Sequence, residues 1–272
     1  MSERPGSAGG SGRTAILRVE SSRHLRSSLA LTIVLLVFVA LYTSMFPGFG
    51  EDAEELAEAF PEFVFDMFDI EALHTFEGFI AAEMYSFFWT ILVGVYFAYL
   101  GASMIAVDVN ERRMDLTLSN PVSRESVLLQ KLASLWVPLV MLNVTVAGAI
   151  YVGSVLIGET VNPVALAMVH LLSIPYLLVC AGIGLLLSVA LGHPRSAKTG
   201  AIGLVIVLWL VDAISRMTGD FEWIGAVAPS RYYGYTAILV REEYALLDAG
   251  VLLAAFVVLI AVATALFVRR DI

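Results

Sequence analysis

Residues 164–191 read VALAMVHLLSIPYLLVCAGIGLLLSVAL, an apolar run with no acidic residue, lysine or arginine. A helix needs about 20 apolar residues to cross a hydrocarbon core roughly 30 Å thick. Similar runs recur along the chain, at about 29–46, 85–107, 132–157, 200–217 and 249–268. The sequence therefore predicts an all-α polytopic membrane protein with six transmembrane helices.

Composition excludes a soluble fold. Of the 272 residues, 59% are hydrophobic and only 15% are charged, and the mean hydropathy is +0.84, whereas soluble domains carry about 25% charged residues. The single cysteine, Cys180, lies inside an apolar run, so no intrachain disulfide is possible. His24, His74, His170 and His193 are scattered along the chain, and no metal site is expected from them.

The N-terminal part divides into a tail and a basic segment. Residues 1–12 are rich in Gly and Ser, which predicts a disordered cytoplasmic tail. Residues 13–28 carry four arginines among apolar residues, which predicts an amphipathic helix on the inner membrane surface. A cleavable signal peptide is the alternative, but the run 29–46 is long for one and lacks a small-residue cleavage site. We therefore expect one six-span domain over residues 13–272.

The basic residues indicate the orientation in the membrane. With six spans both termini lie on one side, and thirteen of the sixteen lysines and arginines fall on that side. Because cytoplasmic loops carry an excess of such residues, the prediction is a multi-pass cell-membrane protein with both termini cytoplasmic. The opposite side holds the acidic segment 50–83, interpreted as a solvated loop or, alternatively, as a cation site.

The loop between the second and third spans is the most informative stretch. It reads DVNERRMDLTLSNPVSR over residues 108–124, with Lys131 following. Asn110 can cap a short helix, Pro121 can stop it, and Ser123 can cap the next helix. The alternative is an ordinary basic loop, which explains the charges but not the turn around Pro121.

With its Glu-Arg start and its LTLSNPVSR core, this loop resembles the type 2 ABC transporter permease family. The stretches APSRYYG (228–234) and FVRRD (267–271) resemble that family's outer re-entrant segment and its exit from the sixth span. Arg112 and Arg113 depart from the family's pattern, because Gly-Thr often follows the glutamate at these positions.

The resemblance implies a non-catalytic, exporting permease subunit. It implies that a separate cytoplasmic ATPase binds ATP and magnesium, that this chain holds no cofactor, and that a second permease chain completes a homodimer or heterodimer. No nucleic acid is expected. The implied ATPase-coupling residues are Glu111, Arg112, Arg113, Asp115, Pro121, Ser123 and Arg124, and the implied re-entrant residues are Pro229, Arg231 and Tyr232. A membrane-embedded enzyme resembling an intramembrane protease, or a non-transporting scaffold, remains the alternative, and the substrate cannot be read from the sequence.

Four polar residues inside spans are flagged as candidates: Asn143, His170, Asp212 and Arg216. His170 is interpreted as a hydrogen-bonded packing residue rather than a ligand. Asp212 and Arg216, one turn apart, form either a structural pair or part of a substrate path. The small residues Gly94, Ala98, Ala102 and Ala106 repeat every fourth position, which favours either packing within the chain or a dimer seam.

Overall fold

The computed structural model describes residues 15–49, 61–114, 122–217 and 219–269. These residues form helices and connecting turns without a strand. Six of the helical stretches are long and apolar enough to cross a membrane: 16–49, 76–110, 124–157, 163–191, 194–217 and 246–269. The predicted all-α polytopic fold with six spans is confirmed.

The spans are built from helices that follow one another along the bundle. The first span is α1 (Ala15–Phe49), the fourth α10 (Pro163–Leu191), the fifth α11 (Pro194–Met217) and the sixth α13 (Leu246–Arg269). The second is composite, made of α4 (Phe76–Ile80), the π-helix η1 (Ala81–Val93), α5 (Gly94–Ser103) and α6 (Ala106–Asn110). The third consists of α8 (Arg124–Ala133) and α9 (Trp136–Ile157).

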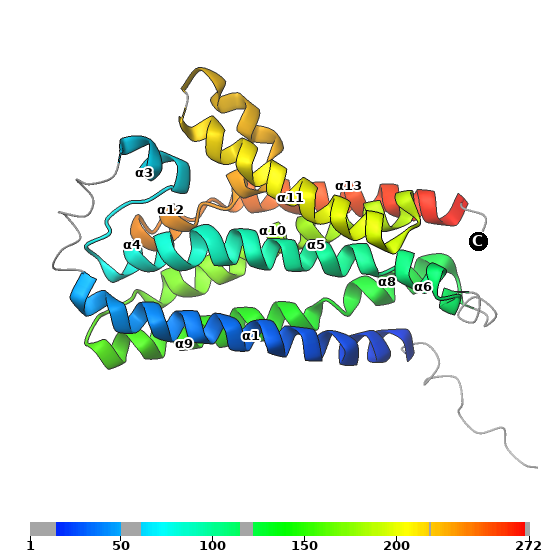
Figure 1. Cartoon of the computed structure of the whole chain (residues 1–272), viewed down its shortest axis with the longest axis horizontal. Helices are drawn as coiled ribbons and strands as arrows, with labels where there is room; N and C mark the ends of the chain where they lie inside the picture. Colours follow the sequence, from blue (N-terminus) through cyan, green and yellow to red (C-terminus); the bar gives the residue numbers. More distant parts are fainter. Residues whose placement is uncertain (1–14, 50–60, 115–121, 218, 270–272) are drawn as a thin grey trace, which may run out of the picture.

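Shorter helices lie outside the spans. One is α3 (Glu62–Phe68), which follows Pro61; the others lie between α11 and α13, namely the 3₁₀ helices η2 (Gly219–Val227) and η3 (Pro229–Tyr232) and the α-helix α12 (Tyr235–Val240). Figure 1 shows α11 and the segment after it projecting from the bundle.

The N-terminal basic segment differs from the sequence-based expectation. Residues 15–28 do not form a separate surface helix but continue into the first span as one helix, α1. The physical reason is that no glycine or proline interrupts residues 15–46, so no signal ends the helix before Pro47. The predicted tail over residues 1–12 lies outside the described residues.

The centre of the bundle is α10, the most enclosed of the spans. It packs against α5 at glycine contacts: a Cβ at Gly184 would lie 2.0 Å from the carbonyl oxygen of Ala98, and a Cβ at Gly101 would lie 2.0 Å from that of Ala181. Ala102 also lies against Gly184. The small residues of the second span therefore pack within the chain, which decides between the two interpretations of that stripe.

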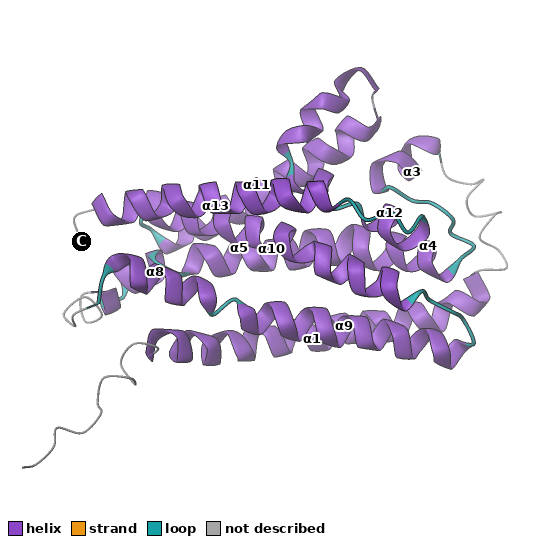
Figure 2. Ribbon diagram, turned by 180° about the vertical axis from the view of Figure 1, so that it is seen from behind, coloured by secondary structure: helices purple, strands orange, loops and turns teal. Residues whose placement is uncertain are grey.

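The two ends of the bundle carry different charges. The basic end holds the start of α1, α6, α8, the turn from α10 to α11 and the end of α13, so both ends of the described chain lie there (Figures 1 and 2). The acidic end holds α3, α4, α12 and the turn from α9 to α10 (Figure 1). The first and last described residues thus share one side, as an even number of spans requires.

Candidate functional site

A buried lysine ties three helices together at the basic end. The Nζ of Lys131, on α8, lies 2.6 Å from a carboxylate oxygen of Glu20 on α1 and 2.6 Å from one of Asp108 on α6. Lys131 is only 4% exposed. A buried ammonium needs opposite charges around it, so these two carboxylates hold α1, α6 and α8 in a fixed arrangement.

The ion contacts continue from this lysine to the surface. Arg113 lies 3.4 Å from Asp108 and also pairs with Glu111. Glu111 is half exposed, and Arg112 beside it is exposed with a positive φ of 54°. A positive φ is uncommon outside glycine, so the turn after α6 holds its backbone in a less favoured conformation. The alternating charges therefore run from the buried Lys131 to an exposed carboxylate.

Arg124 fastens the start of α8 to the sixth span. Its Nη1 donates to the carbonyl oxygen of Phe267 on α13 at 3.0 Å, and its guanidinium lies over the Phe267 ring. Ser123 caps α8, because its Oγ accepts from the backbone N–H of Ser126 at 3.2 Å; this cap was predicted from the sequence. Asp115 and Pro121 lie outside the described residues, and Asn110 ends α6 rather than capping a helix.

The second span is held by α10 near the basic end of the bundle. Between α5 and α6 the regular helix breaks, and the N–H groups of Ile105 and Ala106 donate to the Oγ of Ser188 at 3.1 and 2.8 Å. The same hydroxyl donates to the carbonyl oxygen of Ala102. Backbone polar groups in a membrane must find a partner. Ser188 provides that partner where the helix is interrupted, just before α6, the helix that carries Asp108.

The intramembrane residues Asn143 and His170 meet in the bundle core. His170 Nδ1 lies 3.2 Å from Asn143 Oδ1, and His170 Nε2 lies 2.8 Å from the Tyr85 hydroxyl. The Asn143 Nδ2 already donates to Leu139 O, so its Oδ1 is the acceptor. The proton of a neutral His170 is therefore on Nδ1, and Nε2 accepts from Tyr85. This arrangement connects α9, α10 and η1.

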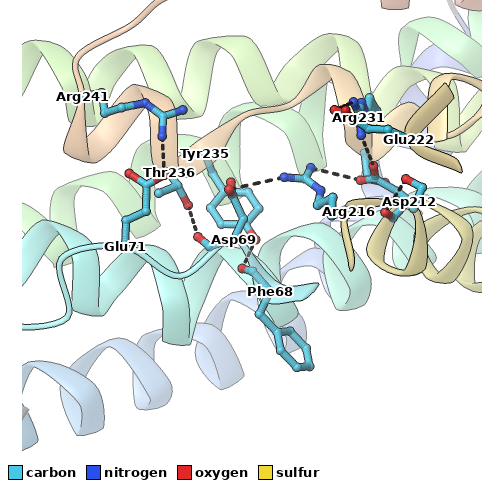
Figure 3. A network of polar contacts seen from close by, with 12 residues as sticks. Phe68, Asp69, Glu71, Asp212, Arg216, Glu222, Arg231, Tyr235, Thr236 and Arg241 are labelled. Atoms are coloured by element: carbon cyan, nitrogen blue, oxygen red, sulfur yellow. Dashed lines mark hydrogen bonds and ion pairs between the residues drawn. The ribbon is translucent and has the colours of Figure 1, made fainter. Parts of the chain in front are cut away.

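Asp212 and Arg216 form the expected pair and belong to a wider network at the acidic end (Figure 3). Arg216 lies 3.1 Å from Asp212 and 3.4 Å from Asp69, which ends α3. Asp212 also accepts from the Ser230 hydroxyl at 2.9 Å, and Arg231 lies 3.9 Å from it. Because Asp212 is almost fully buried, its charge is compensated by these groups.

The predicted re-entrant residues lie in the segment whose Ser230 and Arg231 contact this aspartate. Pro229 begins η3, Arg231 bridges Asp212 and Glu222, and the Tyr232 hydroxyl donates to the carbonyl oxygen of Ala226 at 2.9 Å. The segment after α11 is therefore folded back onto α11 by polar contacts.

The same network anchors α3. Tyr235 and Thr236 donate to the carbonyl oxygens of Phe68 and Asp69, both at 2.7 Å. Burial raises the pKa of the Tyr235 hydroxyl, so Tyr235 stays protonated and remains a donor. Arg241 pairs with Glu71 (Figure 3). The helix α3 is thus joined to the segment that precedes α13.

Sequence reasoning missed the centre of the basic-end network. Lys131 and Asp108 were read only as part of a loop pattern, and Glu20 was not singled out. One signal in the sequence could have indicated this network: these charged residues lie beside long apolar runs. Charged residues in such positions usually face the bundle interior and pair with one another. Across the described ranges, no group of three or more His, Cys, Asp or Glu side chains is arranged to hold a metal ion.

Comparison with known families gives one match. A family model described as ABC-2 family transporter protein matches residues 14–220, which is more than half of the chain and extends from α1 to the start of η2. No curated protein and no solved structure gives a significant match.

Proposed function

Because the chain belongs to the ABC-2 family of transporter proteins, and is therefore a membrane permease of an ABC transporter, we propose that it works as an exporter driven by a separate cytoplasmic ATPase. That ATPase would bind ATP and magnesium. The permease would pair with a second permease chain, so that the translocation path lies between the two. The basic end of the bundle would face the cytoplasm, as the excess of arginine and lysine there supports.

The observation that carries this proposal is the line of charges from Glu111 to Lys131. Glu111 offers an exposed carboxylate at the basic end, where a docked ATPase would arrive. Through Arg113 and Asp108 it is connected to Lys131, and Lys131 holds α1, α6 and α8. A displacement of the loop would therefore move three helices together, as transport driven by a partner subunit requires.

Arg124 has a different part in the same arrangement. Its contact with Phe267 attaches α8 to the end of α13. A movement of the loop that shifts α8 would then also reach the sixth span. Arg124 therefore acts as an internal link, and its replacement would disturb the permease itself as well as any ATPase contact.

The test uses Glu111→Lys in the full chain, purified together with the ABC ATPase that accompanies it in its native membrane. Reversal of a charge in an interface weakens binding, with costs on the order of 2–5 kcal/mol where the pair is desolvated. We expect about tenfold weaker association or more, or loss of substrate-stimulated ATP hydrolysis, with an unchanged melting temperature. The melting temperature should hold because the Glu111 side chain is half exposed, and exposed ion pairs contribute little to stability.

Arg195→Glu is the matched control, since Arg195 is an exposed basic residue at the start of α11, also at the basic end. It should leave association and coupling largely intact. If Glu111→Lys assembles and transports like the parent, the proposed coupling through this loop is wrong. If no ABC ATPase accompanies the chain at all, the transporter-subunit proposal fails.

A further inference from the structure

A cavity of about 600 Å³ lies between α1, α3 and the π-helix η1. Its size is within the range of small-molecule sites, roughly 300–1,000 Å³. Aromatic rings dominate its wall: Tyr42 and Phe49 from α1, Phe65 and Phe68 from α3, and Phe87 and Phe88 from η1. The cavity lies towards the acidic end, beside the segment that the Asp69–Arg216 contact holds against the bundle.

One carboxylate lines this aromatic cavity. Glu83, on η1, is partly buried, and the hydroxyl of Tyr42 lies next to it. No lysine, arginine or histidine is among the described residues of the wall. A carboxylate removed from water is unfavourable unless a positive charge compensates it. The protein supplies none at this wall, so a ligand is the natural source of the compensating charge.

Glu83 lies on the cavity wall within the π-helical segment η1. π-Helical segments are rare and are found frequently at functional sites. Within η1 both hydroxyl side chains of the aliphatic type bond the helix itself: Ser86 donates to the carbonyl oxygen of Ala82, and Thr90 donates to that of Tyr85 at 2.7 Å. These bonds satisfy helix carbonyls, whereas Glu83 remains at the cavity wall.

We propose that this cavity binds lipophilic organic cations, and that such cations are the substrate class of the transporter. This inference rests on the function proposed above and adds the chemistry of the cargo. Aromatic faces attract a cation, with a contribution that grows when the cation is desolvated. The rings of α1, α3 and η1 would hold the apolar groups, and Glu83 would neutralise the charge.

Tetraphenylphosphonium is a suitable probe because tetraphenylborate has nearly the same shape and the opposite charge. Both are measured by equilibrium dialysis against the purified full chain in an uncharged detergent. We expect saturable binding of the cation by the parent and none of the anion. Glu83→Gln, which keeps the size of the side chain, should weaken cation binding at least tenfold.

The control is Glu77→Gln, which removes the same charge from α4 at a partly buried position outside the cavity wall. It should leave the binding of tetraphenylphosphonium unchanged, and both variants should keep the parent's melting temperature. Equal cation binding by Glu83→Gln and the parent, or no saturable binding by the parent, would overturn the inference.

ATPase association, measured separately on the same variants, distinguishes this failure from failure of the proposed function. If the parent associates with an ATPase but the cation does not bind, the transporter proposal stands without this substrate class. If the cation binds through Glu83 but no ATPase associates, the cavity remains a cation site and the transporter proposal is wrong.

Discussion

Lys131 of α8 and Glu20 of α1 are 111 positions apart in the sequence, yet the ammonium of one lies 2.6 Å from the carboxylate of the other. The contact joins the first span to the third beside the loop that is proposed to meet the ATPase. Leu17 of α1 also donates its N–H to Gln130 of α8. The first helix is therefore held at its N-terminal end by polar contacts rather than by apolar packing alone.

Lys131→Met should strongly destabilise the permease. The substitution keeps an unbranched side chain, one atom shorter, but leaves the carboxylates of Glu20 and Asp108 close together without a cation. Breaking a buried ion pair from one side costs about 3–5 kcal/mol. We expect a clear fall in melting temperature of the detergent-solubilised chain, measured by intrinsic fluorescence.

The triple variant Lys131→Met, Glu20→Gln, Asp108→Asn is the companion measurement. Because all three charges are removed together, it should recover much of the lost stability. It should still transport poorly, since the helices are no longer connected by directional contacts. A Lys131→Met variant as stable as the parent would show that the buried charges contribute little.

Gly184→Ala should separate the two central helices. The added methyl carbon would lie 2.0 Å from the carbonyl oxygen of Ala98, and backbone atoms cannot move aside as a flexible side chain can. Overpacking costs typically about 1–3 kcal/mol, occasionally more. The expected result is a lower melting temperature and poor recovery of folded protein from membranes.

Gly203→Ala on α11 is the matched control, because nothing lies within 4 Å of the position where its methyl carbon would be. Alanine favours a helix by up to about 1 kcal/mol relative to glycine, so this variant should be as stable as the parent or slightly more. Equal melting temperatures for the two alanine variants would contradict the close approach of α5 and α10.

The spans could be predicted because they depend on local composition. The predicted fourth span, 164–191, differs by one residue from α10, whose start is set by Asn162 as the cap and Pro163 as the first residue. The Ser123 cap and the Asp212–Arg216 pair were also predicted, because each depends on residues three or four positions apart. Local rules suffice for such features.

Contacts between distant segments could not be predicted. Nothing near Lys131 in the sequence identifies Glu20 and Asp108 as its partners, and nothing near Arg216 identifies Asp69. The π-helical form of η1 was also missed, because apolar periodicity does not separate it from an α-helix. Such features depend on how the spans pack, which a single sequence does not specify.

Asp212→Asn should loosen the segment between α11 and α13. Its buried carboxylate is paired with Arg216 and Arg231 and accepts a hydrogen bond from Ser230. An amide in its place offers only one acceptor oxygen and carries no charge. Buried polar groups left without full partners cost about 1–3 kcal/mol. Limited trypsin digestion should cut at Arg231 sooner than in the parent. Glu243→Gln, which removes only an exposed contact with Arg241, should keep the parental digestion pattern.

Membrane orientation can be measured with single cysteines, because the native Cys180 is buried and should not react with a membrane-impermeant maleimide. Thirteen of the sixteen lysines and arginines belong to the side that carries both termini, and such residues are retained on the cytoplasmic side. Ser196→Cys, exposed in the first turn of α11 at the basic end, should therefore be labelled only in inside-out vesicles. Thr160→Cys, exposed in the turn between α9 and α10, should be labelled only in intact cells. The reverse pattern would place the Glu111 loop outside, where no cytoplasmic ATPase reaches it.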